Sequence, residues 1–141
     1  MAKDPRVDRL RKVPLFEACN DKQLQFIATR VEEVDVPAGK VLTEQGRSGG
    51  EFFVILSGEA DVRRGAATVN TLGAGDYFGE IALLDNGERT ATVTAKTPLR
   101  CLVLSPRQFQ DVLYQDPAIA VSMLHSVVRR LRAAARELPT D

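Results

Sequence analysis

The residues with the clearest chemical potential lie in one short stretch, from Gly79 to Thr90. Gly79 allows the backbone to approach a ligand closely, and the good helix formers that follow, Glu80–Leu84, predict a single helical turn. The first N–H groups of such a turn have no acceptor within the helix. Arg89 follows a glycine turn and adds a guanidinium, and Thr90 adds a hydroxyl donor on the same predicted strand edge. Free N–H groups and one guanidinium together suit a singly charged phosphate.

Glu80 is the unexpected residue in this stretch, because a carboxylate beside a phosphate repels it unless the carboxylate accepts a hydrogen bond. A ribose hydroxyl next to a cyclic phosphate would supply that donor. Taken singly, Glu80 is explained as an acid that stabilises a helix N-terminus, and Arg89 is explained as a solvated cation on the surface. Glu80 and Arg89 lie nine residues apart within this one stretch, and together they indicate a ligand site.

The stretch Phe78–Leu84 followed by Arg89–Val93 closely resembles the phosphate-binding cassette of cyclic nucleotide-binding domains, a family found in the catabolite activator protein, in cyclic nucleotide-dependent kinases and in gated channels. The resemblance extends over about residues 10–135. It implies that Glu80 accepts from the ribose 2′-OH, that Arg89 pairs with the exocyclic phosphate oxygens and that Thr90 contacts the phosphate or the base. The full set of implied ligand-binding residues is Gly79, Glu80, Ile81, Ala82, Arg89, Thr90 and Ala91, with backbone N–H groups of Ile81, Ala82 and Ala91 around the phosphate.

The base of the nucleotide is less sharply indicated than its phosphate. By resemblance cAMP is favoured over cGMP, although a hydroxyl residue directly after the arginine, here Thr90, leaves cGMP open. The Thr-Ser pair that contacts adenine late in the long helix of the catabolite activator protein is replaced here by Ala134 and Ala135. Arg132 or Arg136 could cover the base by stacking, but solvated arginines are the simpler explanation.

The elements expected to hold these residues form a mainly β fold with flanking helices. Short β-branched runs separated by turn residues predict an antiparallel β-roll, a jelly roll of the double-stranded β-helix type, rather than βαβ units. The expected organisation is a single domain with an N-terminal helical segment at 1–30, a β-roll at 31–104 containing the cassette at 78–93, and two C-terminal helices at 105–138. The predicted strand runs are 34–36, 40–45, 52–56, 60–63, 67–72, 89–95 and 99–104.

Capping residues and prolines mark where the helices begin. The starts are predicted at Asp4-Pro5, Asn20 or Asp21, Ser105-Pro106 and Asp116-Pro117. In the last helix, one predicted face carries Ile119, Met123, Val127, Arg130 and Ala134, and beside it lie Leu124, Val128, Leu131 and Ala135. This apolar stripe is either a lid over the ligand or the seam of a homodimer.

Composition excludes several other classes of protein. The 141 residues carry 19 Lys plus Arg and 19 Asp plus Glu, so no global basic field favours nucleic acid or membrane binding. No apolar run approaches the ~20 residues that span a bilayer, and Met1–Pro5 lacks the apolar core of a signal peptide, so a cytoplasmic protein is expected. Cys19 and Cys101 match no metal or redox spacing and are expected to be buried thiols. The single histidine, His125, lies in the last predicted helix, which argues against a metal-dependent jelly-roll enzyme.

These observations predict a cyclic nucleotide sensor that is not an enzyme and needs no cofactor or metal. Ligand binding is expected to move the C-terminal helices. Only five residues follow Arg136, so no DNA-reading domain is expected to follow, and the output would lie on an effector protein, on a homodimer partner or on a longer parent chain. The alternative is a degenerate domain of the same fold that mediates protein interaction or dimerisation without nucleotide.

Overall fold

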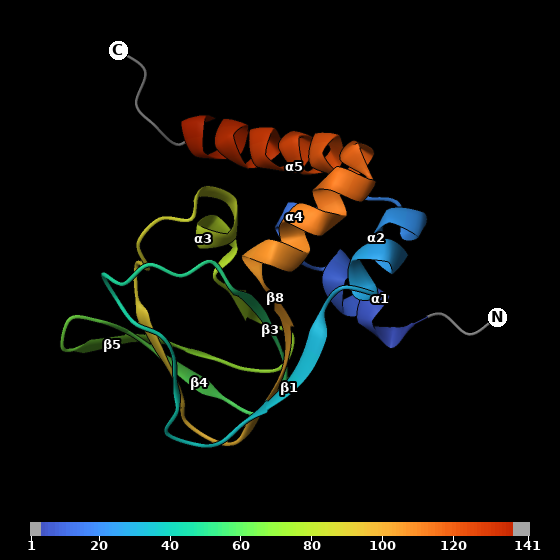
Figure 1. Cartoon of the computed structure of the whole chain (residues 1–141). Helices are drawn as coiled ribbons and strands as arrows, with labels where there is room; N and C mark the ends of the chain where they lie inside the picture. Colours follow the sequence, from blue (N-terminus) through green and yellow to red (C-terminus); the bar gives the residue numbers. More distant parts are fainter. Residues whose placement is uncertain (1–3, 137–141) are drawn as a thin grey trace, which may run out of the picture. The chain divides into compact units, whose positions relative to one another are not determined.

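The chain folds into two compact units, and the computed structural model describes residues 4–136 (Figure 1). The β unit comprises Arg30–Phe109, and the helical unit comprises the described parts of Met1–Thr29 and Gln110–Asp141. The outermost parts of the predicted helical segments, 1–3 and 137–138, lie outside the described residues. The expectation of a single domain stays a prediction.

The β unit consists of two four-stranded sheets in which all neighbouring strands are antiparallel. The first sheet has the order β1 (Glu32–Val36), β8 (Leu99–Leu104), β3 (Phe52–Ser57) and β6 (Tyr77–Phe78). The second has the order β2 (Val41–Thr43), β7 (Thr92–Ala95), β4 (Ala60–Arg64) and β5 (Ala67–Leu72). The predicted mainly β fold with flanking helices is confirmed.

Side chains from both sheets form the apolar core of the β unit. Its buried members are Val36, Phe53, Ile55, Ala60, Val93, Ala95, Leu99 and Cys101. Phe53 stacks on Phe78 with ring centroids 4.7 Å apart, which anchors the short strand β6 directly before the cassette. Burial of apolar surface in this core therefore positions the strand that leads into Gly79.

Two details of the predicted strands are wrong. The strand β6 was not expected, and the strand expected to start at Arg89 starts at Thr92. The reason is a competing pairing: Arg89 donates its backbone N–H to Arg47 O at 2.9 Å and accepts from Gly46 N at 2.9 Å, beside an isolated bridge between Ser48 and Glu88. Arg89 is therefore held by the loop at 46–48, and neither Arg89 nor Thr90 lies on a strand edge.

The predicted helical turn after Gly79 is present as α3 (Glu80–Asp85). The next helix, α4 (Pro106–Gln115), begins in the β unit at the predicted Ser105-Pro106 signal. There Ser105 and Gln108 form a reciprocal cap, with Ser105 Oγ accepting from Gln108 N at 3.2 Å and Gln108 Oε1 accepting from Ser105 N at 2.9 Å.

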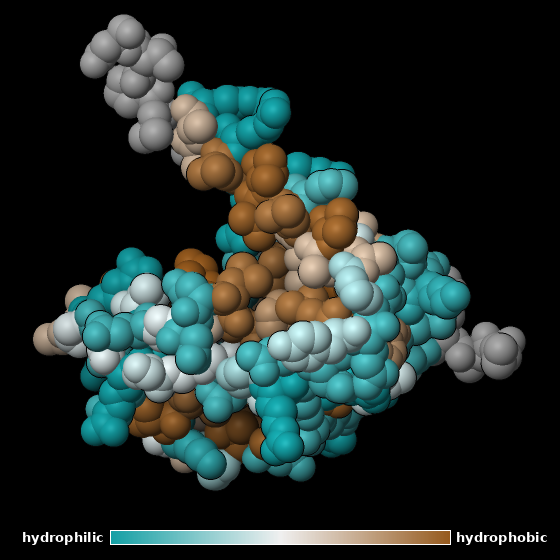
Figure 2. Space-filling model, turned by 45° about the horizontal axis from the view of Figure 1, so that its top comes forward, coloured by the Kyte–Doolittle hydropathy of each residue, from teal (hydrophilic) through white to brown (hydrophobic). Residues whose placement is uncertain are grey.

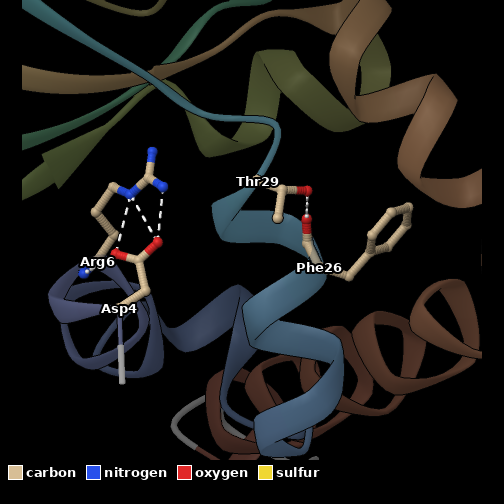
Figure 3. A network of polar contacts seen from close by, with 4 residues as sticks. All are labelled: Asp4, Arg6, Phe26 and Thr29. Atoms are coloured by element: carbon tan, nitrogen blue, oxygen red, sulfur yellow. Dashed lines mark hydrogen bonds and ion pairs between the residues drawn. The ribbon is translucent and has the colours of Figure 1, made fainter. Parts of the chain in front are cut away.

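The helical unit contains α1 (Pro5–Arg11), a 3₁₀ turn η1 (Pro14–Phe16), α2 (Asp21–Ala28), the end of α4 and α5 (Pro117–Arg136). Asp4 caps α1 by accepting from Arg6 N at 3.0 Å, and its carboxylate also pairs with the Arg6 guanidinium (Figure 3). At the C-terminal end of α2, Thr29 Oγ1 donates to Phe26 O at 2.6 Å (Figure 3). At the start of α2, Asn20 Oδ1 accepts from Gln23 N at 2.8 Å, and with the Asp4 cap this explains why the predicted starts at Asp4-Pro5 and at Asn20 agree with the structure.

The helix α5 packs on η1 through the first half of its predicted face. Ile119 and Met123 are buried, but Arg130 and Ala134 of the same face are exposed. Polar contacts within the helical unit add to the packing: Ser126 Oγ accepts from Ala18 N at 3.3 Å and Arg129 pairs with Glu17 at 3.6 Å. No helix of the described residues is long and apolar enough to cross a membrane.

Both cysteines are buried, as predicted, and burial raises the pKa of the Cys19 and Cys101 thiols to about 11. The thiolate form is therefore suppressed at neutral pH, which makes these thiols unreactive in the folded state. His125 is exposed on α5.

Candidate functional site

Gly79 begins the site, because it caps α3 in a conformation that other residues rarely adopt. Its φ is 91°, in the left-handed region. A Cβ on Gly79 would lie 2.5 Å from Glu51 O and 2.9 Å from Arg89 Nη1. The absent side chain therefore lets the arginine approach the start of α3.

Arg89 is buried, with a relative exposure of 7%, although it carries a full positive charge. Its Nη2 donates to Glu51 O at 2.9 Å and to Glu51 Oε2 at 3.2 Å. Its Nη1 is buried without a hydrogen-bond partner in the described residues. Burial lowers the pKa of Arg89 from its usual value, and Glu51 acts in the opposite direction. An unsatisfied buried guanidinium nitrogen is costly in isolation, so a ligand oxygen is its natural partner.

Glu80 is the first residue of α3 and is also buried, with a relative exposure of 8%. A carboxylate removed from water at a helix N-terminus gains from the helix dipole. Its burial beside a cavity distinguishes it from a solvated surface acid.

A cavity of about 290 Å³ in the β unit brings these residues together. All seven predicted ligand-binding residues line it: Gly79, Glu80, Ile81, Ala82, Arg89, Thr90 and Ala91. They come from α3 and from the loop before β7. The sequence stretch of the cassette thus forms one wall of a single cavity.

The cavity is also lined by residues outside the predicted ligand-binding set, of which Phe78, Glu88 and Val93 belong to the cassette range 78–93 and the others come from strands outside it. These further lining residues are Thr43, Val62, Arg64, Asn70, Leu72, Tyr77, Phe78, Glu88 and Val93. Val62 lies opposite both Asn70 on β5 and Val93 on β7 in the strand register. The period-2 spacing of Asn70 and Leu72 on β5 was a usable signal that these two residues share a face, whereas the β4–β5 register shifts between Val62 and Arg63. Which face meets the cassette depends on the pairing of distant strands.

Arg132 and Arg136, considered above for the base, lie on α5 in the helical unit and are exposed. Their contact with a base stays a prediction. Among the described residues, no group of three or more His, Cys, Asp or Glu side chains is arranged to hold a metal ion.

The chain was compared with protein families, and the model described as "Cyclic nucleotide-binding domain" matches residues 33–116. The match contains every residue of the cassette, and the resemblance found in the sequence is confirmed.

Regulatory subunits of cAMP-dependent protein kinase are among the relatives. That of Mycosarcoma maydis is 39% identical over 74% of this chain and 22% of its own length. That of Eremothecium gossypii is 37% identical over 86% of this chain and 26% of its own length. The chain therefore spans about a quarter of the length of these relatives.

Solved structures with the same fold include a domain of a transcriptional regulator and a catabolite activator protein. The N-terminal domain of a transcriptional regulator from Streptomyces coelicolor A3(2) aligns with a TM-score of 0.86 and 31% identity, covering 95% of this chain and 99% of that domain. The catabolite activator protein of Thermus thermophilus aligns with a TM-score of 0.69 and 28% identity, covering 89% of this chain and 61% of that protein.

Proposed function

The chain belongs to the family of cyclic nucleotide-binding domains, and from this premise we propose that its cavity binds cAMP in preference to cGMP and that its role is regulatory rather than catalytic. The observation that carries the proposal is the buried guanidinium of Arg89. Its Nη1 has no hydrogen-bond partner among the described residues, and Arg89 and Glu80 line the same cavity. A cyclic phosphate supplies an anionic oxygen for the first group, and its ribose supplies a hydroxyl for the second.

The rest of the cavity suits a purine nucleoside. Val62, Leu72 and Val93 offer apolar surface for the flat face of a base. Thr90 provides a hydroxyl at the cassette end of the cavity. The stacking of Arg132 or Arg136 on the base stays part of the proposal. The preference for cAMP is supported by relatives that are regulatory subunits of cAMP-dependent protein kinase.

Coupling of the ligand to the C-terminal helices is supported by the close packing around Gly50. A Cβ on Gly50 would lie 2.5 Å from Pro106 Cγ at the start of α4, 3.4 Å from Ala82 O of α3 and 3.4 Å from Oδ1 of Asn86, the C-cap residue of α3. We propose that a shift of α3 towards a bound phosphate is passed through this contact to α4. A ligand drives such a shift only by its difference in affinity for the two arrangements.

The test is calorimetric titration of the purified chain with cAMP and with cGMP, alongside Arg89→Ala. The variant removes a charge-assisted contact worth about 1.5–3 kcal/mol, so we expect cAMP affinity to fall about 10- to 150-fold. The matched control is Arg100→Ala, which removes another arginine–glutamate pair, to Glu33 at 2.8 Å, on an exposed strand surface. It should bind cAMP as the wild type does.

Each outcome bears on a different part of the proposal. Unchanged cAMP affinity in Arg89→Ala would overturn the assignment of the phosphate site. Tighter binding of cGMP than of cAMP would overturn the choice of base alone. Binding of neither nucleotide would favour the alternative, an interaction module of the same fold without a nucleotide.

A protein-interaction role beside nucleotide binding is favoured by the exposed apolar face of α5. Val121, Leu124, Val128 and Leu131 are exposed by 54%, 61%, 42% and 67%. Figure 2 shows hydrophobic side chains gathered along the helix that leads to the C-terminal end. Their 3-4-3 spacing is that of a and d positions in a coiled coil. We propose that this face, the α5 seam, pairs with the same face of a second copy or with an effector protein.

A further inference from the structure

Glu51 holds the cassette arginine in place, but it does not belong to the cassette. It directly precedes β3, and its side chain is 48% exposed, whereas that of Arg89 is 6% exposed. Both its backbone carbonyl at 2.9 Å and its carboxylate Oε2 at 3.2 Å accept from the same nitrogen, Arg89 Nη2.

The two ends of the Arg89 guanidinium therefore differ. Nη2 has two acceptors on Glu51, while the buried Nη1 has none in the described residues. Nη1 lies against Gly79, since a Cβ there would be 2.9 Å away from it. A planar guanidinium cannot turn one nitrogen without turning the other, so fixing Nη2 also fixes where Nη1 points.

Glu51 does not occupy the cavity in which the nucleotide is proposed to bind, so it would not compete with the ligand for that space. Arg89 lines two cavities, the one of about 290 Å³ described above and a second of about 260 Å³. Glu51 lines the second cavity, together with Glu44 and Arg47, and is not among the residues that line the first. The Glu51 carboxylate thus contacts Arg89 without lining the cassette cavity.

Charge gives the contact a second effect. Desolvation disfavours a buried guanidinium, and a nearby carboxylate offsets part of that cost. Without the Glu51 carboxylate, Arg89 Nη2 would keep only the carbonyl of residue 51, which carries no full charge. Moving the long arginine side chain so that its charge reaches water would then be favourable.

We propose that Glu51 is a positioning residue that holds Arg89 with Nη1 directed at the phosphate of the bound nucleotide. The proposal rests on the proposed function. It goes beyond the cassette because it assigns part of the ligand affinity to a side chain that no ligand atom has to touch.

The experiment is a double-mutant cycle measured by titration with cAMP, using the full chain. Glu51→Ala should weaken cAMP binding on the order of tenfold, the size expected for a lost hydrogen bond to a charged group. Glu51→Gln keeps an acceptor and loses the charge, so it should recover part of the affinity. In an Arg89→Ala background Glu51→Ala should have no further effect, because the two residues act as one unit.

Glu44→Ala is the matched control, since Glu44 lines the same second cavity and pairs with Arg47 at 3.2 Å rather than with Arg89. It should bind cAMP normally. Normal cAMP affinity of Glu51→Ala, or an equal loss in the Arg89→Ala background, would overturn the positioning role and leave the proposed function intact. A wild-type chain that binds no cyclic nucleotide would overturn both.

Discussion

At the scale of single residues, the site depends on two opposite charges that are both removed from water. Arg89 and Glu80 line one cavity of the β unit, at relative exposures of 7% and 8%. Burial of an ionised group is costly unless a partner is supplied. A ligand with an anionic oxygen would supply a partner for Arg89 Nη1, and the proposed cyclic nucleotide would add a ribose hydroxyl that can donate to Glu80.

The role of Glu80 can be tested by altering the ligand and, as a control, the residue itself. We expect 2′-deoxy-cAMP to bind about 10- to 150-fold more weakly than cAMP, because the analogue leaves the buried carboxylate without the ribose donor. In Glu80→Ala the two nucleotides should bind with similar affinity. Competition titrations of both ligands against both proteins measure this, and equal affinities in the wild type would dismiss the ribose contact.

At the scale of elements, α3 and the loop before β7 are brought together by backbone geometry. Gly79 provides the positive φ at which α3 begins, and backbone bonds to Gly46 and Arg47 hold Arg89 beside it. Asn86 ends α3, also with a positive φ, of 54°. The short helix is thus limited at both ends by left-handed residues, which sets its position relative to Arg89.

Gly79→Ala tests this arrangement at the level of the element. The left-handed φ costs about 1–2 kcal/mol of folding free energy for an alanine, and the new Cβ would displace the guanidinium. We expect a lower free energy of unfolding in denaturant titrations, together with at least tenfold weaker cAMP binding.

The variant Gly39→Ala separates the cost of the left-handed backbone from the displacement of the Arg89 guanidinium. Gly39 has a φ of 89°, almost that of Gly79, but a Cβ there would meet nothing within 4 Å. It should lose comparable stability and keep full cAMP affinity. Equal loss of affinity in the two variants would show that backbone strain, rather than the contact with Arg89, controls binding.

At the scale of the whole molecule, the described chain contains the cassette cavity in one unit and an exposed apolar face in the other. Leu124 and Leu131 are the most exposed members of the α5 seam. Large exposed apolar side chains in a row are typical of interaction surfaces. If the proposed function holds, the partner through which the chain acts is best sought in what this face contacts.

We expect Leu124→Glu combined with Leu131→Glu to shift the chain to monomer in sedimentation experiments, because two charges would be buried at a dimer seam. Val69→Glu is the matched control, since Val69 is also an exposed apolar residue, at 50%, but lies on β5. A wild-type chain that is monomeric at all concentrations would exclude the homodimer and leave an effector protein as the partner of the seam.

The sequence by itself determined the class of fold and the chemistry of one wall of the site. Local signals were sufficient there: glycine before a helical turn, capping residues before Pro5 and Pro106, and β-branched runs bounded by turn residues all act between near neighbours. The seven cassette residues fall within 13 positions of one another, so their proximity required little tertiary information.

Only the tertiary structure decided what faces that wall and what holds it. Val62, Asn70 and Leu72 reach the cavity through antiparallel pairing of β4 with β5 and β7, and Glu51 meets Arg89 across 38 positions of sequence. The loop at 46–48 also overrode the strand expected at Arg89. Such contacts depend on which distant backbone groups pair when the core closes, and no local propensity encodes that choice.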